Sequence, residues 1–275
     1  MTTRTETTIT PDSKIPLLFV YEEGHTPRPA VIVLHGTRRT KEIGVSEHDQ
    51  YLNGGEFVRV YPDAPLHGAR LPQGHPLAQD ATWTAYLRGE GDALRDVIIP
   101  VVSGMASEVS SIIDYLLTRP DLVAPHFATY GFSVAGLMSL LAANRESRLD
   151  AAVMLCTPVR FQLMVLGMAY QWNNDAIEEA AQYDPMARPD KFPPTALLFV
   201  HGSRDDLIPV EAPRDVYGRL KPHYASTPER LRISEYPHVR HYLDKPAPYS
   251  TPQAMEQIVQ LREEARLWLK RFLNP

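Results

Sequence analysis

The chain alternates short apolar runs with longer helix-like stretches, and this alternation constrains the fold more than any other feature of the sequence. The runs are rich in Val, Ile, Leu and Phe, which is typical of strands buried on both faces of a mainly parallel sheet. We expect strands near residues 15–21, 30–35, 57–61, 126–130, 151–156, 196–201 and 231–236. We expect helices near residues 94–118, 134–145, 211–222 and 252–272. This order predicts an α/β fold with a mainly parallel, twisted sheet and helices on both faces.

One segment, residues 158–191, breaks the alternation. It is about twice the length of a usual strand-to-helix connection, and apolar residues precede its acidic part, "NNDAIEEAAQYD". We interpret it as a small helical cap, although a surface excursion packed on the core would also fit. No other stretch resembles a linker. The prediction is therefore a single domain, residues 1–275, with a cap inserted at 158–191.

The composition limits the class of protein. The apolar share is 44%, enough for a sizeable core, and no uninterrupted apolar run approaches the roughly 18 residues of a membrane helix. The opening "MTTRTETTIT" lacks the pattern of a secretory signal. The single cysteine, Cys156, lies in the apolar segment "AAVMLC" and is expected to be a small buried side chain. These observations favour a cytoplasmic protein.

The formal charge of −5 is spread over a mixture of acidic and basic residues. Such a distribution gives no electrostatic reason to expect a nucleic acid or a membrane as partner. A small-molecule substrate remains the expected ligand. The sequence leaves the oligomeric state open, a homodimer included.

The stretch "YGFSVAG" places Ser133 between a predicted strand and a predicted helix. In that context the pattern G-x-S-x-small indicates a serine held on a tight turn, with its hydroxyl exposed. The amide of Val134, at the helix start, would then point to where an anionic oxygen forms. The alternative is that Ser133 is an ordinary helix N-cap.

A serine hydroxyl needs a histidine to take its proton and a carboxylate to orient that histidine. "LLFVHGSRDDLIPV" supplies Asp205 directly after an apolar strand, with Asp206 as the competing acid. "SEYPHVRHYL" supplies His241, preferred over His238 because the extra residues allow its loop to curl back. Ser133, Asp205 and His241 thus follow three predicted strands in the chain order Ser, Asp, His.

A second donor for the anionic oxygen is expected in "VIVLHGTRRTKE", where His35-Gly36 ends an apolar strand. The amide of Thr37 would join that of Val134. The neighbouring Arg38, Arg39 and Lys41 could attract an acidic substrate, but we interpret them as a solvated loop.

These segments, together with "YPDAPLHGAR", resemble the α/β-hydrolase superfamily, in particular small bacterial serine hydrolases and esterases related to dienelactone hydrolases and to the catalytic domain of prolyl oligopeptidases. The resemblance runs from about residue 28 to residue 272. It implies a Ser133 nucleophile, a His241 base, an orienting Asp205, and oxyanion amides at Thr37 and Val134. Ala135 stands where that family usually has glycine.

We therefore expect a carboxylic-ester hydrolase that works through an acyl-enzyme and needs no metal or organic cofactor. The alternatives are a small-peptide or acyl-peptide hydrolase with the same three residues and a non-catalytic ligand-binding protein of this fold. Metal-assisted hydrolysis is disfavoured, because the histidines near strand ends show no metal-ligand spacing. An apolar substrate pocket is expected from the cap residues Met164, Met168, Tyr170 and Trp172.

Overall fold

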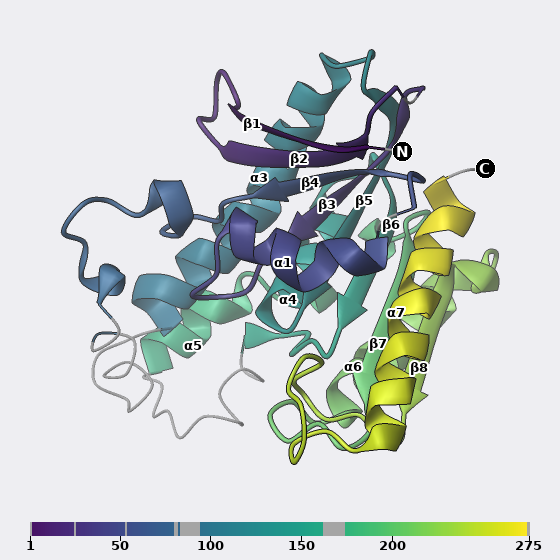
Figure 1. The fold of residues 1–275 in the computed structure, drawn as a ribbon. Helices are drawn as coiled ribbons and strands as arrows, with labels where there is room; N and C mark the ends of the chain where they lie inside the picture. Colours follow the sequence, from purple (N-terminus) through teal and green to yellow (C-terminus); the bar gives the residue numbers. More distant parts are fainter. Residues whose placement is uncertain are drawn as a thin grey trace.

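The computed structural model describes residues 2–24, 26–52, 54–79, 82, 94–161 and 174–273. Its centre is an eight-stranded sheet in the order β1-β2-β4-β3-β5-β6-β7-β8 (Figure 1). β1 pairs antiparallel with β2, and β2 pairs antiparallel with β4, whereas all pairs from β4 to β8 are parallel. The strands are β1 (Thr3–Ile9), β2 (Pro16–Glu22), β3 (Arg28–Leu34), β4 (Val58–Pro62), β5 (Val123–Phe132), β6 (Leu149–Leu155), β7 (Ala196–Gly202) and β8 (Leu231–Tyr236).

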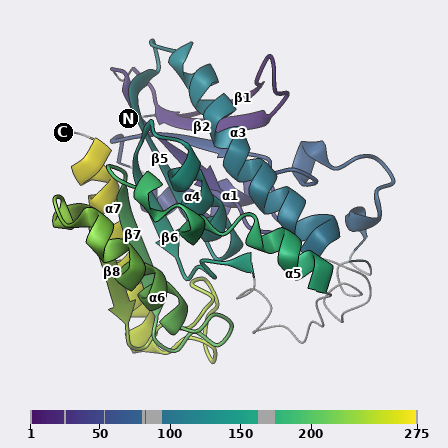
Figure 2. The same cartoon turned by 180° about the vertical axis from the view of Figure 1, so that it is seen from behind.

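Helices cover both faces of this sheet. One face carries α1 (Lys41–Leu52) and α7 (Pro252–Leu273), which lie in front of the strands in Figure 1. The other face carries α3 (Ile99–Leu117), α4 (Val134–Arg145) and α6 (Glu211–Leu220), as the reverse view in Figure 2 shows. The mainly parallel sheet between two helical layers confirms the predicted fold class.

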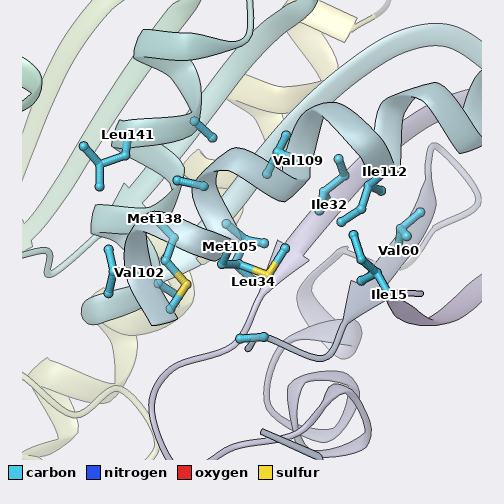
Figure 3. Close-up of a cluster of buried hydrophobic side chains, with 14 of the residues drawn as sticks. Ile15, Ile32, Leu34, Val60, Val102, Met105, Val109, Ile112, Met138 and Leu141 are labelled. Atoms are coloured by element: carbon cyan, nitrogen blue, oxygen red, sulfur yellow. The ribbon is translucent and has the colours of Figure 1, made fainter. Parts of the chain in front are cut away.

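The buried residues of the strands explain why the sheet needs both layers. Along β3, Ile32 and Leu34 pack toward α3 and α4, while Val31 and Val33 pack toward α7. Successive side chains of a strand point to opposite faces, so an uninterrupted apolar run leaves two faces to cover. Figure 3 shows the α3 side of this core. The side chains labelled there are Ile15, Ile32, Leu34, Val60, Val102, Met105, Val109, Ile112, Met138 and Leu141.

The predicted strands and helices are found within a few residues of their expected bounds, and Cys156 is buried as expected. Among the described strands and α-helices, β1 and α1 were not predicted. β1 is an edge strand of sequence TRTETTI whose side chains are mostly exposed, so it has no apolar signal. α1 buries Lys41, Gly44, His48 and Leu52. These residues have helical spacing but only one of them is strongly apolar, which is why hydrophobic periodicity did not reveal the helix.

The described part of the segment 158–191 contains α5 (Asn174–Ala181) and two single 3-10 turns, Pro185–Ala187 and Pro189–Lys191. α5 contacts the π-helical turn Leu94–Ile98 that precedes α3. The four residues expected to form a substrate pocket, Met164, Met168, Tyr170 and Trp172, lie outside the described residues.

The stretch Arg95–Leu117, which contains α3, is long and apolar enough to cross a membrane by length and composition. However, 56% of its most apolar window is buried inside the protein. α3 packs against α4 and contributes Val102, Met105 and Val109 to the core. Its apolar character is therefore that of a core helix.

Candidate active site

Ser133 occupies a strained turn between β5 and α4. Its φ of 56° and ψ of −123° lie in a region that residues with a side chain rarely adopt. The turn is so tight that a Cβ on Gly131 would lie 2.1 Å from the Ala135 carbonyl oxygen, and one on Gly136 would lie 2.7 Å from the Thr157 Cβ. Glycine at these two positions is therefore a steric requirement of the turn.

The structure brings Ser133, His241 and Asp205 together. The Ser133 hydroxyl makes no N-cap hydrogen bond to α4 and instead lies 3.0 Å from His241 Nε2. His241 Nδ1 lies 2.9 Å and 3.1 Å from the two carboxylate oxygens of Asp205. The Nδ1–H donated to the carboxylate leaves Nε2 free to accept the serine proton, and this is the geometry that activates a serine nucleophile.

Asp205 is fixed by its own loop. One carboxylate oxygen accepts hydrogen bonds from the amides of Leu207 at 2.9 Å and Ile208 at 2.7 Å. His201 Nε2 lies 3.3 Å from the other oxygen and 2.9 Å from the Ile208 carbonyl. Burial alone would raise the pKa of Asp205, but hydrogen bonds from His201 and His241 outweigh burial and hold that pKa well below its usual value. The carboxylate is therefore ionised and can orient the imidazolium.

Asp206 and His238, the alternatives to Asp205 and His241, make other contacts. Asp206 accepts hydrogen bonds from Arg240 and from the Tyr249 hydroxyl, both at 2.7 Å, and thereby ties the loop that carries His241. The amide of His238 donates to Gln257 on α7 at 2.9 Å. The residue that reaches Ser133 is thus His241 and the acid behind it is Asp205. The sequence analysis considered Asp206 only as an alternative to Asp205. It did not predict that Asp206 would hold the His241 loop.

Thr37 and Val134 both line the cavity that contains Ser133. Two buried histidines brace the Thr37 loop against the loop after β4. His35 Nε2 accepts the Ala64 amide at 3.0 Å, and His67 Nε2 accepts the Arg38 amide at 2.9 Å. Each Nδ1 lies 2.8 Å from a backbone carbonyl, so both imidazoles act as neutral groups that donate through Nδ1. The brace fixes the amide of residue 37 from its two sides.

Burial keeps these two imidazoles neutral. It lowers the pKa of His35 from 6.5 to about 4 and also lowers the pKa of His67. The loop is further held by Asp63, a fully buried carboxylate that accepts from the Lys41 amide at 2.9 Å and from Lys41 Nζ at 2.8 Å. The interpretation of Lys41 as part of a solvated loop is therefore wrong, since it is a buried ion-pair partner. Of the three basic residues of this segment, Arg38 and Arg39 are exposed and Lys41 is buried.

The cavity around Ser133 has a volume of about 670 Å³, within the range of roughly 300–1,000 Å³ that is common for small-molecule sites. The loop after β4 contributes apolar residues to its lining, namely Leu66, Leu71, Leu77 and Ala78, together with His67. The polar residues Glu47, His48, Tyr130, Asp244 and Arg262 also line the cavity.

Within the described ranges, no group of three or more His, Cys, Asp or Glu side chains is arranged to hold a metal ion. His35, His67 and His201 are among the histidines near strand ends, and they make the loop hydrogen bonds given above. Sequence reasoning missed the bracing role of His35 and His67. The motifs "LHG" and "LHGAR" carry these histidines, but their pairing across two loops has no signal in the sequence.

The chain is similar to several known proteins. No protein-family model matches the chain. "Putative esterase YitV" of Bacillus subtilis is 27% identical over 237 residues, covering 80% of this chain and 86% of that protein. TT1662 of Thermus thermophilus superposes with a TM-score of 0.74 at 20% identity, over 100% of both chains.

Two further structures share the fold. The Pyrococcus furiosus esterase Pf2001 superposes with a TM-score of 0.63 at 13% identity, covering 99% of this chain and 94% of that one. The Pyrococcus horikoshii acylaminoacyl peptidase superposes with a TM-score of 0.66 at 13% identity, covering 99% of this chain and 42% of that one. Esterase and peptidase relatives together support a serine hydrolase of the α/β fold. The chain has the α/β-hydrolase fold.

Proposed function

We propose that this protein hydrolyses carboxylic esters through an acyl-enzyme formed on Ser133. The observation that carries the proposal is the continuous hydrogen-bonded line from Ser133 Oγ through the His241 ring to the Asp205 carboxylate, at 3.0 Å and 2.9 Å. His241 Nε2 takes the hydroxyl proton as Oγ attacks the ester carbonyl. Asp205 stabilises the resulting imidazolium.

The first half of the reaction forms a tetrahedral intermediate whose oxyanion accepts hydrogen bonds from the amides of Thr37 and Val134. His241 then gives its proton to the departing alkoxide, so an alcohol leaves and the acyl group stays on Ser133. In the second half, a water molecule loses a proton to His241 and attacks the acyl carbonyl. The acid departs, and the proton returns to Ser133.

Esters are favoured over peptides because the sequence match to a protein named as a putative esterase covers 80% of this chain. The acylaminoacyl peptidase shares the fold over only 42% of its own length. An alcohol is also a better leaving group than an amine, so the site needs less assistance with esters. The cytoplasmic location and the homodimer stay predictions from the sequence.

Labelling with a fluorophosphonate probe tests the nucleophile. The native protein is expected to be labelled, and Ser133→Ala is expected to abolish labelling. Ser46→Ala is a matched control, because Ser46 lies on the exposed side of α1 and bonds only the Ile43 carbonyl. Folded protein whose labelling does not depend on Ser133 would overturn the proposal and favour the non-catalytic alternative.

Turnover of matched esters and anilides tests the reaction. Ester cleavage is expected to exceed anilide cleavage, and the reverse order would favour the peptide-hydrolase alternative. His241→Ala is expected to abolish turnover, whereas His238→Ala retains most of it. Removal of a triad nucleophile costs on the order of 10⁶ in kcat in other hydrolases, so a partial loss would not support the assignment.

A further inference from the structure

Three polar side chains on one side of the cavity have no part in the proposed reaction. His48 comes from α1, Tyr130 from the end of β5 and Arg262 from α7. All three line the same cavity as Ser133 and His241. α1 and α7 contact each other on one face of the sheet, as Figure 1 shows. We call His48, Tyr130 and Arg262 the α1–α7 subsite.

Arg262 is a buried cation without a described counter-ion. Its exposed fraction is 7%, and none of the carboxylates in the described ranges forms an ion pair with it. Its contacts are the Tyr51 ring, 3.5 Å from the guanidinium carbon, and a long 3.4 Å hydrogen bond to the Leu243 carbonyl. Its Nε has no hydrogen-bond partner. A buried charge left unpaired is costly, so this position favours an anion.

His48 and Tyr130, like Arg262, have a buried polar atom without a hydrogen-bond partner. His48 Nδ1 and Tyr130 Oη are buried and lack hydrogen-bond partners in the described structure, and the two rings lie 5.5 Å apart. Burial, and then the positive charge of Arg262, lowers the pKa of His48 to about 3. Burial also raises the pKa of Tyr130 above its usual value. At neutral pH the subsite therefore holds a neutral imidazole, a protonated phenol and a guanidinium, all able to donate a hydrogen bond.

The acidic residues of the cavity do not neutralise this subsite. Glu47 forms an ion pair with Arg39 at 2.8 Å, and Asp244 is exposed. The loop after β4 contributes Leu66, Leu71, Leu77 and Ala78 to the same cavity. A substrate bound there therefore meets both apolar side chains and the positive charge of Arg262.

We propose that the α1–α7 subsite binds a carboxylate carried by the substrate, and hence that the preferred substrates are half-esters of dicarboxylic acids or esters of hydroxy acids. This proposal rests on the ester hydrolysis proposed above. A carboxylate offers two acceptor oxygens, which a guanidinium can bind in a forked geometry.

The test compares kcat/KM for acidic esters and their neutral counterparts. Monoethyl glutarate and monoethyl adipate are paired with ethyl valerate and ethyl hexanoate for the acyl side of the ester. The acetyl ester of a short ω-hydroxy acid is paired with butyl acetate for the alcohol side. On one of the two sides the native protein is expected to favour the acidic member by about tenfold or more. Because the cation is buried, that preference is expected to change little with added salt.

Arg262→Met is expected to lower the ratio of acidic to neutral turnover by about tenfold or more. Arg266→Met is the matched control. It removes the same charge from the same helix, but Arg266 pairs with Glu56 and Glu263 and is not part of the cavity wall. The control is expected to keep the native ratio. Thermal unfolding of each variant establishes that it is folded.

Calorimetric titration of adipate into Ser133→Ala gives a readout that needs no turnover. If adipate binds to Ser133→Ala and the added substitution Arg262→Met abolishes this binding, the subsite is supported. This conclusion holds even if labelling shows that Ser133 is not a nucleophile. The proposal is overturned if Ser133-dependent turnover shows no preference for acidic esters. It is equally overturned if Arg262→Met changes stability but leaves the ratio unchanged, because trapped water would then satisfy these polar groups.

Discussion

Acidification from about pH 7 to about pH 5 is expected to destabilise this protein through two buried histidines. Burial lowers the pKa of His35 from 6.5 to about 4 and that of His48 from 6.5 to about 3. In both cases the folded protein holds the imidazole neutral, whereas the unfolded chain binds a proton below about pH 6.5. The free energy of unfolding therefore has its full value above about pH 6.5. It decreases as the pH falls toward the pKa values of the two histidines in the folded protein.

At pH 5 each of these histidines is expected to cost about 2 kcal/mol, together about 4 kcal/mol. That is a large part of the ~5–15 kcal/mol that stabilises a typical domain. Carboxylates add little in this window. Glu146, for example, has a pKa lowered from 4.5 to about 2 by its hydrogen bonds with Arg148, so its contribution is lost only at lower pH. His67, whose pKa is also lowered, acts in the same direction as His35.

Urea denaturation followed by circular dichroism at pH 7, 6 and 5 measures this loss. His48→Gln is expected to remove about half of the loss, because it removes one of the two buried imidazoles. His223→Gln, at an exposed position, serves as the control and is expected to keep the native pH dependence. A free energy of unfolding that stays constant between pH 7 and pH 5 would refute the reasoning.

Three further predictions concern the turn, the oxyanion loop and the cysteine. Gly131→Ala is expected to lower the free energy of unfolding by about 3 kcal/mol or more, because its Cβ would lie 2.1 Å from the Ala135 carbonyl oxygen; a loss below about 1 kcal/mol in urea denaturation would contradict this. His67→Phe removes the acceptor of the Arg38 amide and is expected to reduce kcat for a neutral ester by about 10- to 1,000-fold with little change in KM; unchanged kcat in the folded variant would argue against the brace. Cys156 is fully buried, and burial raises the pKa of its thiol, so a thiol reagent is expected to modify it only after unfolding; rapid modification of the native protein would disprove this.

Local chemistry explains why so much of the site was predictable. The turn at Ser133 depends on neighbours in the chain, since Gly131 must lack a Cβ and the strand must end where the helix begins. Asp205 and His241 each follow a strand of the same parallel sheet, and parallel strands deliver the residues after them to one edge. Strand order along the chain was therefore enough to expect the three side chains at one place.

Other parts of the site depend on contacts between distant residues, which the sequence does not predict. The environment of Lys41 is set by Asp63, more than twenty residues away and on another loop. The bracing of the Thr37 loop needs His67, which accepts the Arg38 amide. In the sequence, nothing distinguishes His67 from the other histidines near strand ends. α1 was not predicted because the side chains that it buries are mostly polar or small.

The sequence by itself determined the layered α/β architecture and indicated that Ser133, Asp205 and His241 would meet, because apolar runs and turn residues act through neighbours along the chain. Only the tertiary structure decided which polar groups stay without a partner. Arg262, His48 and Tyr130 lie far apart in the sequence and meet where α1, β5 and α7 pack together. Burial and unpaired charge are properties of that packing, and the order of residues along the chain does not show them.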